Sequence, residues 1–362
     1  MTDRLRNSFP LICLFLFSQL LVLHVSGCED QQKNRVNTVF VPVNGYNFQP
    51  PAPPQNTVST ATVPTISMPD NRNQTIEALL NSLDITREFS FLSTLAADSY
   101  QGRKTGSAGA EASADFISTE FTRLGLQPWT RIGLSSYTHH FIAGDTESDN
   151  VIAVLPGKNP NNAYVILAAH YDHLGLDVSG QPFNGADDNA AGVAAILEIA
   201  SIFQQTGLKP EKDIVFCAFS GEETGQRGSK ALGRTIFDMG LGNQVEMINI
   251  DGIGATGGGY LGIWDEGFSG AAKLVGALEE AGTTLGTPTK REGTDIGSDA
   301  QPFDWQYSIP AVTVDWDWGS DPSIWHPYYH TIYDDAGQIN QTVLEQATRV
   351  VLLGLWLRAS ET

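Results

Sequence analysis

Five short motifs contain the side-chain types that bind metal ions and move protons. In chain order they are HYDHLG, NGADDNAAG, SGEETG, one aspartate after an apolar run, and YYHT. Their acids and histidines of interest are His170, Asp172, Asp187, Asp188, Glu222, Glu223, Asp251 and His330. Nitrogen and oxygen ligands without a thiolate suit zinc, and manganese or cobalt are also compatible. A carboxylate that holds no metal can act as a general acid or base.

Each motif alone has a simpler interpretation. Asp187 and Asp188 could cap the helix that follows them, and adjacent glutamates often mark a solvated turn. A single histidine at a strand end is more commonly a polar residue with its hydrogen bonds made within the fold than a metal ligand. The combination is more specific, because two histidines and three carboxylates at one sheet edge would repel one another if unpaired. A pair of cations removes this repulsion, so the pattern predicts a metal centre.

Apolar runs and helical periods indicate the elements that must position these residues. Buried strands are predicted at 150–155, 164–169, 213–219, 246–250 and 311–315. Helices are predicted at 75–83, 88–96, 108–124, 189–205, 228–238, 267–281 and 340–357. This alternation indicates an α/β fold with a doubly wound, mostly parallel mixed sheet flanked by helices. Ligands of such sheets bind beyond the carboxyl ends of the strands, where His170, Glu222 and Asp251 are expected.

The ordered set of motifs resembles the co-catalytic di-zinc aminopeptidases of peptidase clan MH, which include bacterial leucyl aminopeptidase-like proteins and relatives of glutaminyl cyclases. The resemblance covers roughly 88–357 and includes GRKTGSAG at 102–109. It implies the zinc-dependent exopeptidase fold and two Zn²⁺ ions. By motif position, Asp188 bridges the two metals, His170 and Asp251 bind one, and Glu223 and His330 bind the other.

The same resemblance implies roles for the residues around the metals. Glu222 is the general base that takes a proton from the water shared by the two metals, and Asp172 accepts a hydrogen bond from His170. Tyr329 matches a tyrosine that stabilises the oxyanion, with Tyr328 as the other candidate; both could instead be pocket walls. The peptide bond after Asp188 is expected to be cis.

The predicted substrates are peptides with an apolar amino-terminal residue. An aromatic stretch before His330 could line a side-chain pocket, or several of its members could be core: Phe303, Trp305, Tyr307, Trp316, Trp318 and Trp325. Nearby, Ala300 replaces the histidine of a family SDH-type motif. Three other interpretations are a glutaminyl cyclase with one zinc, a carboxypeptidase-type member, and a binding protein that has lost its metals. The carboxypeptidase is disfavoured because no basic cluster accompanies the motifs.

The amino-terminal segment has the pattern of an export signal. Residues 1–27 contain a basic start and an apolar run, and the tetrad VSGC at 25–28 resembles a bacterial lipoprotein cleavage box. This resemblance implies lipid on Cys28 and a location at the bacterial cell envelope, periplasmic or on the outer surface; plain secretion is the alternative. Residues 28–74, rich in Pro, Asn and Thr, are predicted to be a tether, and 75–362 the metallopeptidase domain.

Composition excludes several other classes of function. The chain has 362 residues, with 41 acidic and 21 basic side chains and a formal net charge of −20. This acidity argues against nucleic acid as a partner. Three cysteines do not make a disulfide framework.

The expected partners are peptide substrates and, through Cys28, a membrane, and the expected oligomeric state is a monomer.

Overall fold

A computed structural model of the chain describes residues 70–362, except 266, 268 and 294–296. The predicted signal peptide, Cys28 and most of the predicted tether lie outside the described residues. Within the described ranges, no helix combines the length and apolar character needed to cross a membrane. The boundaries of the predicted segments therefore stay predictions.

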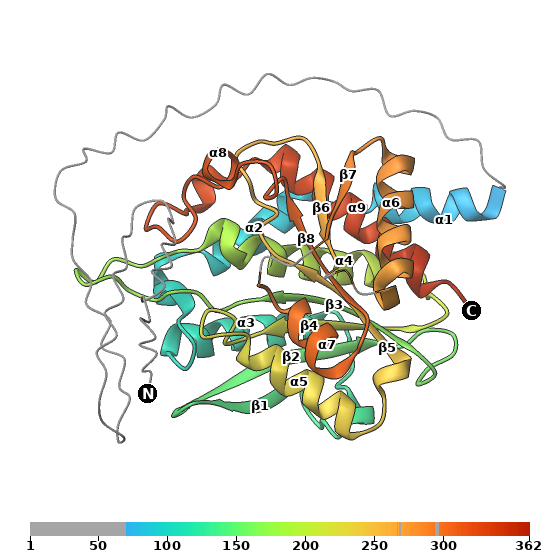
Figure 1. Ribbon diagram of the computed structural model, residues 1–362, viewed down its shortest axis with the longest axis horizontal. Helices are drawn as coiled ribbons and strands as arrows, with labels where there is room; N and C mark the ends of the chain where they lie inside the picture. Colours follow the sequence, from blue (N-terminus) through green and yellow to red (C-terminus); the bar gives the residue numbers. More distant parts are fainter. Residues whose placement is uncertain (1–69, 266, 268, 294–296) are drawn as a thin grey trace, which may run out of the picture. The chain divides into compact units, whose positions relative to one another are not determined.

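A mixed eight-stranded sheet forms the centre of the fold (Figure 1). Its strand order is β1-β2-β4-β3-β5-β8-β6-β7. The strands are β1 Thr138–Ala143, β2 Thr146–Leu155, β3 Tyr164–His170, β4 Asp213–Phe219, β5 Val245–Ile250, β6 Leu261–Trp264, β7 Thr289–Gly293 and β8 Ala311–Trp316. The four central strands, β4, β3, β5 and β8, are parallel to one another. The pairs β1–β2, β2–β4 and β6–β8 are antiparallel, and β7 is parallel to β6.

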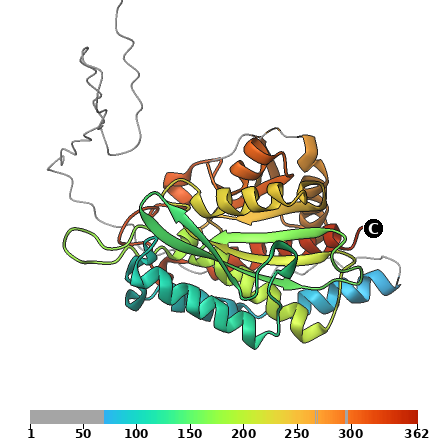
Figure 2. The same ribbon diagram turned by 90° about the horizontal axis from the view of Figure 1, so that it is seen from below.

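Helices cover both faces of this sheet, and Figure 2 shows α3 and α5 on opposite sides of it. The larger hydrophobic core lies between one face and six helices: α1 Asp70–Asn81, α2 Ile85–Leu95, α3 Ala108–Arg123, α4 Ala191–Thr206, α6 Ala272–Leu285 and α9 Gln341–Ala359. The second core packs under α5 Arg227–Asp238 and α7 Ala300–Tyr307. A short helix, α8 Pro322–Trp325, lies in the loop after β8.

Burial explains why the central strands form where they do. Every residue of β3, β4 and β5 is buried, as expected for strands covered on both faces. Their sequences YVILAAH, DIVFCAF and VEMINI are rich in β-branched and apolar residues. The carboxyl ends of these strands meet at one edge of the sheet, which is where the motif residues lie.

The predicted mixed α/β architecture is confirmed, with differences at the sheet edges. Strands β1, β6 and β7 were not predicted. The sequence of β7, TKREG, is charged and partly exposed, so it lacks an apolar pattern. The helix predicted at 189–205 begins at Ala191 instead, because Ala186–Ala190 forms an irregular turn in which Asp188 and Asn189 have non-helical dihedral angles.

Candidate metal centre

Strand ends and the loops after them carry the motif residues. His170 is the last residue of β3, and Asp251 follows β5 directly. Glu222 and Glu223 lie in the loop between β4 and α5. The remaining ligand candidates come from the turn before α4, which carries Asp188, and from the loop after α8, which carries His330. The fold thus brings all five predicted ligands together.

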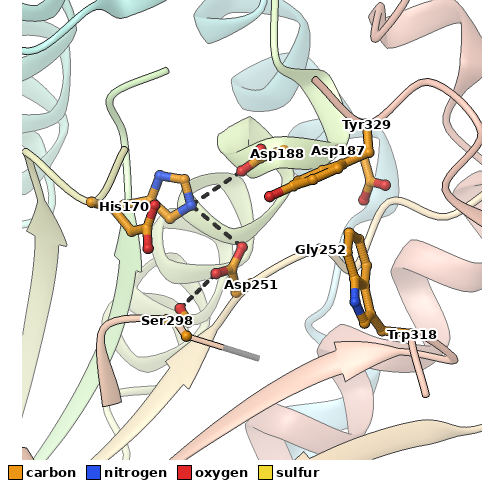
Figure 3. A pocket seen from close by; sticks show the side chains of 10 residues that line it. His170, Asp187, Asp188, Asp251, Gly252, Ser298, Trp318 and Tyr329 are labelled. Carbon is orange, nitrogen blue, oxygen red and sulfur yellow. Dashed lines mark hydrogen bonds and ion pairs between the residues drawn. The ribbon is translucent and has the colours of Figure 1, made fainter. Parts of the chain in front are cut away.

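Three side chains form the first ligand group: His170, Asp188 and Asp251. His170 Nε2 lies 3.2 Å from Asp188 Oδ1 and 3.3 Å from Asp251 Oδ1 (Figure 3). The other oxygen of Asp251 accepts a hydrogen bond of 2.5 Å from the Ser298 hydroxyl. Ser298 therefore turns one carboxylate oxygen of Asp251 toward His170 and holds the other away from it.

Four side chains form the second group: His173, Asp188, Glu223 and His330. His330 Nε2 lies 3.1 Å from Asp188 Oδ2 and 3.3 Å from Glu223 Oε2. Asp188 belongs to both groups and uses a different oxygen in each. This is the arrangement expected of a carboxylate that bridges two cations. The peptide bond between Asp188 and Asn189 is cis, as the resemblance implied.

The donor set fits two divalent cations. Asp188 Oδ2 is buried and makes no hydrogen bond, although it lies 3.1 Å from His330 Nε2. An unpaired buried carboxylate oxygen is costly, and a cation between these two atoms would satisfy both. Two histidine nitrogens and three carboxylates without a thiolate suit zinc.

Strong mutual interactions shift the pKa values of the ligands. Burial alone would lower the pKa of His170, but the carboxylates of Asp251 and Asp188 raise it well above its usual range. Burial likewise opposes protonation of His330, yet Asp188 and Glu223 raise its pKa to about 10. Burial alone would raise the pKa of Asp188, but the surrounding histidines hold it well below its usual range. Each histidine charge is thus coupled to a carboxylate that can also hold a metal.

Glu222 differs from its neighbour Glu223 because it belongs to neither ligand group. It lines the same cavity of about 80 Å³ as His170, Asp188 and Asp251. Burial raises its pKa well above the usual range, and nearby carboxylates, including Asp251 and Glu223, raise it further, although His170 lowers it. A carboxylate with a raised pKa beside a metal centre is suited to accept and return a proton.

The contacts of Asp172 differ from the expected hydrogen bond to His170. His170 Nδ1 lies 3.1 Å from the main-chain carbonyl of Asp172, whereas the Asp172 carboxylate is 3.9 Å away. That carboxylate instead accepts hydrogen bonds from the Thr105 hydroxyl at 2.6 Å and from the Glu222 N–H at 3.2 Å. Asp172 therefore orients His170 through its main chain and the Glu222 loop through its side chain.

Several residues that support the site were missed from the sequence. Both N–H groups of the Asp187–Asp188 pair donate to the Asp334 carboxylate, at 2.9 and 3.1 Å. His326 pairs with the Asp187 carboxylate, which also accepts a hydrogen bond of 2.7 Å from the Gly254 N–H. Neither His326 nor Asp334 belongs to a recognisable motif. His173 was also missed, although it lies within HYDHLG and that motif could have drawn attention to it.

Of the predicted aromatic pocket, only Trp318 lines the cavity at the metal centre. Trp316 and Phe303 are buried core residues. Trp305 is exposed, and Tyr307 packs against Phe237 on α5. The structure thus agrees with the alternative that several of these rings are core residues, and the six rings do not line one pocket.

Tyr329 lies at the cavity and Tyr328 does not line it. The Tyr329 ring stacks on His330 with centroids 3.8 Å apart and makes an edge contact of 4.8 Å with Trp318. Its hydroxyl points into the cavity in Figure 3. The geometry thus favours Tyr329 over Tyr328 as the residue next to a reacting group.

Comparison with known proteins identifies the family. Residues 150–354 match peptidase family M28. The chain belongs to this family. Family M28 membership agrees with the resemblance to clan MH, and together with the two ligand groups it supports zinc as the metal.

Two curated relatives match this chain over part of their own length. Leupeptin-inactivating enzyme 1 of Streptomyces exfoliatus is 28% identical over 296 residues, which cover 77% of this chain and 62% of that protein. The alkaline phosphatase isozyme conversion protein of Escherichia coli K12 is 32% identical over 171 residues, covering 42% of this chain and 47% of that protein. The chain therefore spans less than two thirds of either relative.

Solved structures with the same fold include both aminopeptidases and a cyclase. LapA aminopeptidase of Legionella pneumophila has a TM-score of 0.64 at 18% identity, covering 82% of this chain and 78% of that one. BSAP, a zinc aminopeptidase from Bacillus subtilis, has a TM-score of 0.63 at 18% identity, covering 76% and 95%. Glutaminyl cyclase of Porphyromonas gingivalis has a TM-score of 0.61 at 22% identity, covering 75% and 98%. These similarities show that the chain has the same fold as these three proteins.

Proposed function

We propose that this protein is a zinc-dependent aminopeptidase that removes apolar amino-terminal residues from peptides. One observation carries the proposal: two ligand groups share Asp188, and Glu222 lines the same cavity while belonging to neither group. This arrangement separates metal binding from proton transfer, which is what metal-assisted hydrolysis requires.

Each residue around the cavity has a distinct part in the proposed reaction. Two bound zinc ions would lower the pKa of a water molecule and polarise the scissile carbonyl. The Glu222 carboxylate takes the proton from the attacking water and later gives it to the leaving amine. The Tyr329 hydroxyl, which points into the cavity, donates to the carbonyl oxygen as negative charge develops on it. Trp318 and Tyr329 provide apolar surface for the side chain of the first residue.

The charge of the cavity favours an amino terminus over a carboxyl terminus as the end that binds. Besides the metal ligands Asp188 and Asp251, its lining includes two carboxylates that belong to neither ligand group, Asp187 and Glu222, and no described lining residue is lysine or arginine. An acidic cavity attracts a peptide ammonium group and repels a carboxylate. This supports an aminopeptidase rather than a carboxypeptidase.

A glutaminyl cyclase is the second candidate, since one of the solved structures with this fold is such an enzyme. The sequence resemblance implies one zinc ion for that activity and two for an aminopeptidase. The family resemblance also implies that a cyclase retains most of these ligand residues, so the ligand groups alone do not separate the two activities. The two activities also differ in product: a cyclase forms a pyroglutamyl peptide, whereas an aminopeptidase releases a free amino acid.

The test combines a peptide panel with two neighbouring variants. Wild-type protein is incubated with peptides that have a free, an acetylated or a glutamine amino terminus, with and without a chelator, and products are identified by mass. We expect stepwise shortening of the free peptides only, and its loss with chelator. Glu222→Gln should keep two zinc ions and lose about 10²- to 10⁴-fold in kcat. Its matched neighbour Glu223→Gln should instead lose zinc.

Three outcomes would contradict the proposal. Cleavage of acetylated peptides would exclude recognition of a free amino terminus, and pyroglutamyl product alone would identify a cyclase. Full activity of Glu222→Gln would assign the base to another residue.

For location, we propose attachment to the bacterial cell envelope through lipid on Cys28, supported by the VSGC tetrad.

A further inference from the structure

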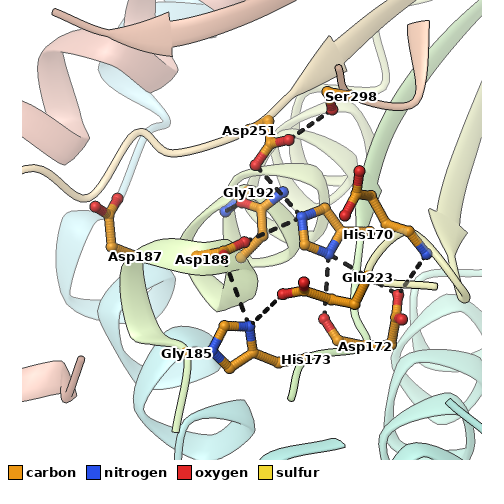
Figure 4. Close-up of polar contacts among 12 residues, drawn as sticks. His170, Asp172, His173, Gly185, Asp187, Asp188, Gly192, Glu223, Asp251 and Ser298 are labelled. Atoms are coloured by element: carbon orange, nitrogen blue, oxygen red, sulfur yellow. Dashed lines mark hydrogen bonds and ion pairs between the residues drawn. The ribbon is translucent and has the colours of Figure 1, made fainter. Parts of the chain in front are cut away.

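His173 contacts the metal centre but has no part in the reaction proposed above. It is the second histidine of the HYDHLG motif, and its ring is buried. His173 Nδ1 lies 2.7 Å from Glu223 Oε1 and 3.6 Å from Asp188 Oδ2 (Figure 4). This proximity has two explanations: His173 is a further ligand of the second metal, or it is a hydrogen-bond donor to Glu223.

The distances distinguish these two explanations. Ligand atoms around a tetrahedral zinc ion at about 2.0–2.1 Å lie about 3.3 Å from one another. His330 Nε2 matches this spacing, at 3.1 Å from Asp188 and 3.3 Å from Glu223. His173 Nδ1 fits this spacing less well, because it lies only 2.7 Å from Glu223 Oε1. A separation of 2.7 Å is instead typical of a charge-assisted hydrogen bond.

The environment of the ring supports a donor at Nδ1. His173 Nε2 is buried and has no hydrogen-bond partner among the described residues, so a proton there would be a buried unsatisfied N–H, whereas a proton on Nδ1 is donated to Glu223. Gly185 packs against the ring, and a Cβ at that position would lie 2.6 Å from His173 Cδ2. The His173 main-chain N–H donates to the Arg103 carbonyl at 3.2 Å. The ring is therefore held in place on the side away from Glu223.

The hydrogen bond leaves Glu223 with one oxygen for a metal. Oε1 accepts from His173, and Oε2 lies 3.3 Å from His330 Nε2 on the side of the second ligand group. We propose that His173 is a positioning residue: it holds Glu223 so that a single oxygen faces the second metal, and it thereby sets the affinity for that ion. Residues that hydrogen-bond to metal ligands commonly change metal affinity 10- to 100-fold when removed.

This inference rests on the proposed two-metal site, and its test compares two variants of one residue. His173→Asn places an amide N–H near the position of Nδ1 and should keep the bond to Glu223. His173→Leu has similar bulk without a donor. Zinc is titrated into metal-free wild type and both variants in competition with a chromogenic chelator, and bound zinc is counted by mass spectrometry. Urea unfolding of the metal-free proteins is the control for folding.

We expect His173→Leu to bind one zinc ion as wild type does and the other about 10- to 100-fold more weakly. His173→Asn should bind both ions within about threefold of wild type, and the metal-free variants should unfold at similar urea concentrations. Unchanged affinities in His173→Leu would overturn the inference. If Asn and Leu weakened zinc binding equally, His173 would be a direct ligand. If zinc affinity fell equally at both sites, His173 would have a general structural role. Either result overturns the inference. A wild type that binds fewer than two ions would instead refute the proposed two-metal site itself.

Discussion

Replacing Arg103 by lysine tests how the chain holds its metal-binding loops together. The Arg103 guanidinium is buried and donates four hydrogen bonds, all to main-chain carbonyls. Nε donates to Tyr171 at 2.8 Å, and Nη2 donates to Gly185 at 2.9 Å. Nη1 donates to Leu95 at 2.9 Å and to Asn184 at 2.5 Å. The side chain thus joins the loop after His170, the loop before the Asp187–Asp188 turn, and the end of α2.

The number of bonds gives the size of the expected effect. Burial lowers the pKa of Arg103 to about 10 despite nearby carboxylates, so the side chain stays charged at pH 7. A lysine keeps the charge but has one nitrogen, which we expect to reach about two of the four carbonyls. Hydrogen bonds from charged donors contribute about 1.5–3 kcal/mol each. Losing two of them should therefore lower the free energy of unfolding by about 3–6 kcal/mol.

Urea unfolding in the presence of chelator measures this effect without the contribution of bound metal. Arg234→Lys is the matched control, because Arg234 is exposed and pairs only with Asp238 one helical turn away. That exposed pair should contribute less than about 1 kcal/mol. If the free energy of unfolding fell no more in Arg103→Lys than in Arg234→Lys, the argument that Arg103 stabilises the metal-binding loops through its hydrogen bonds would be refuted.

Two further predictions concern residues that are not assigned to the metal centre. Burial raises the pKa of Glu88 well above its usual range, so its contribution to stability is present below the unfolded-state pKa and is lost as pH rises through the folded-state value. The free energy of unfolding of Glu88→Gln relative to wild type should therefore increase by up to about 1.4 kcal/mol for each pH unit above about pH 4.3. Urea unfolding at several pH values measures this difference. A difference that does not change with pH would contradict the prediction. Cys28→Ser should move the protein from the membrane to the soluble fraction of cells, and continued membrane association would exclude lipid attachment at Cys28.

The central strands could be predicted because burial on both faces leaves a continuous apolar run. The strand predicted at 164–169 became Tyr164–His170, and the strand at 213–219 has the predicted bounds. Edge strands lack this signal. β7 has the sequence TKREG, and it is identified only by its pairing with β6.

Motif order likewise identified the five ligand candidates: His170, Glu223 and Asp251 lie at or soon after strand ends, Asp188 precedes α4, and His330 lies in the loop after α8. It could not find Asp334, whose carboxylate binds two main-chain N–H groups of the Asp187–Asp188 turn. Main-chain partners leave no mark on the sequence. The sequence also could not decide which aromatic residues are core and which line the cavity: Trp316 and Trp318 are close in sequence, but the first is at the buried end of β8 and the second is beyond it, at the cavity.

The charges of the ligand groups explain why these side chains are stable together. Asp188, Glu223 and Asp251 would be three buried or half-buried anions at one sheet edge. In the absence of metal, His170 and His330 offset them, because both histidines have raised pKa values and lie 3.1–3.3 Å from the carboxylates. Protons and divalent cations therefore compensate the same negative charge. A site built in this way can fold before it is loaded, and binding of metal then requires the histidines to release their protons.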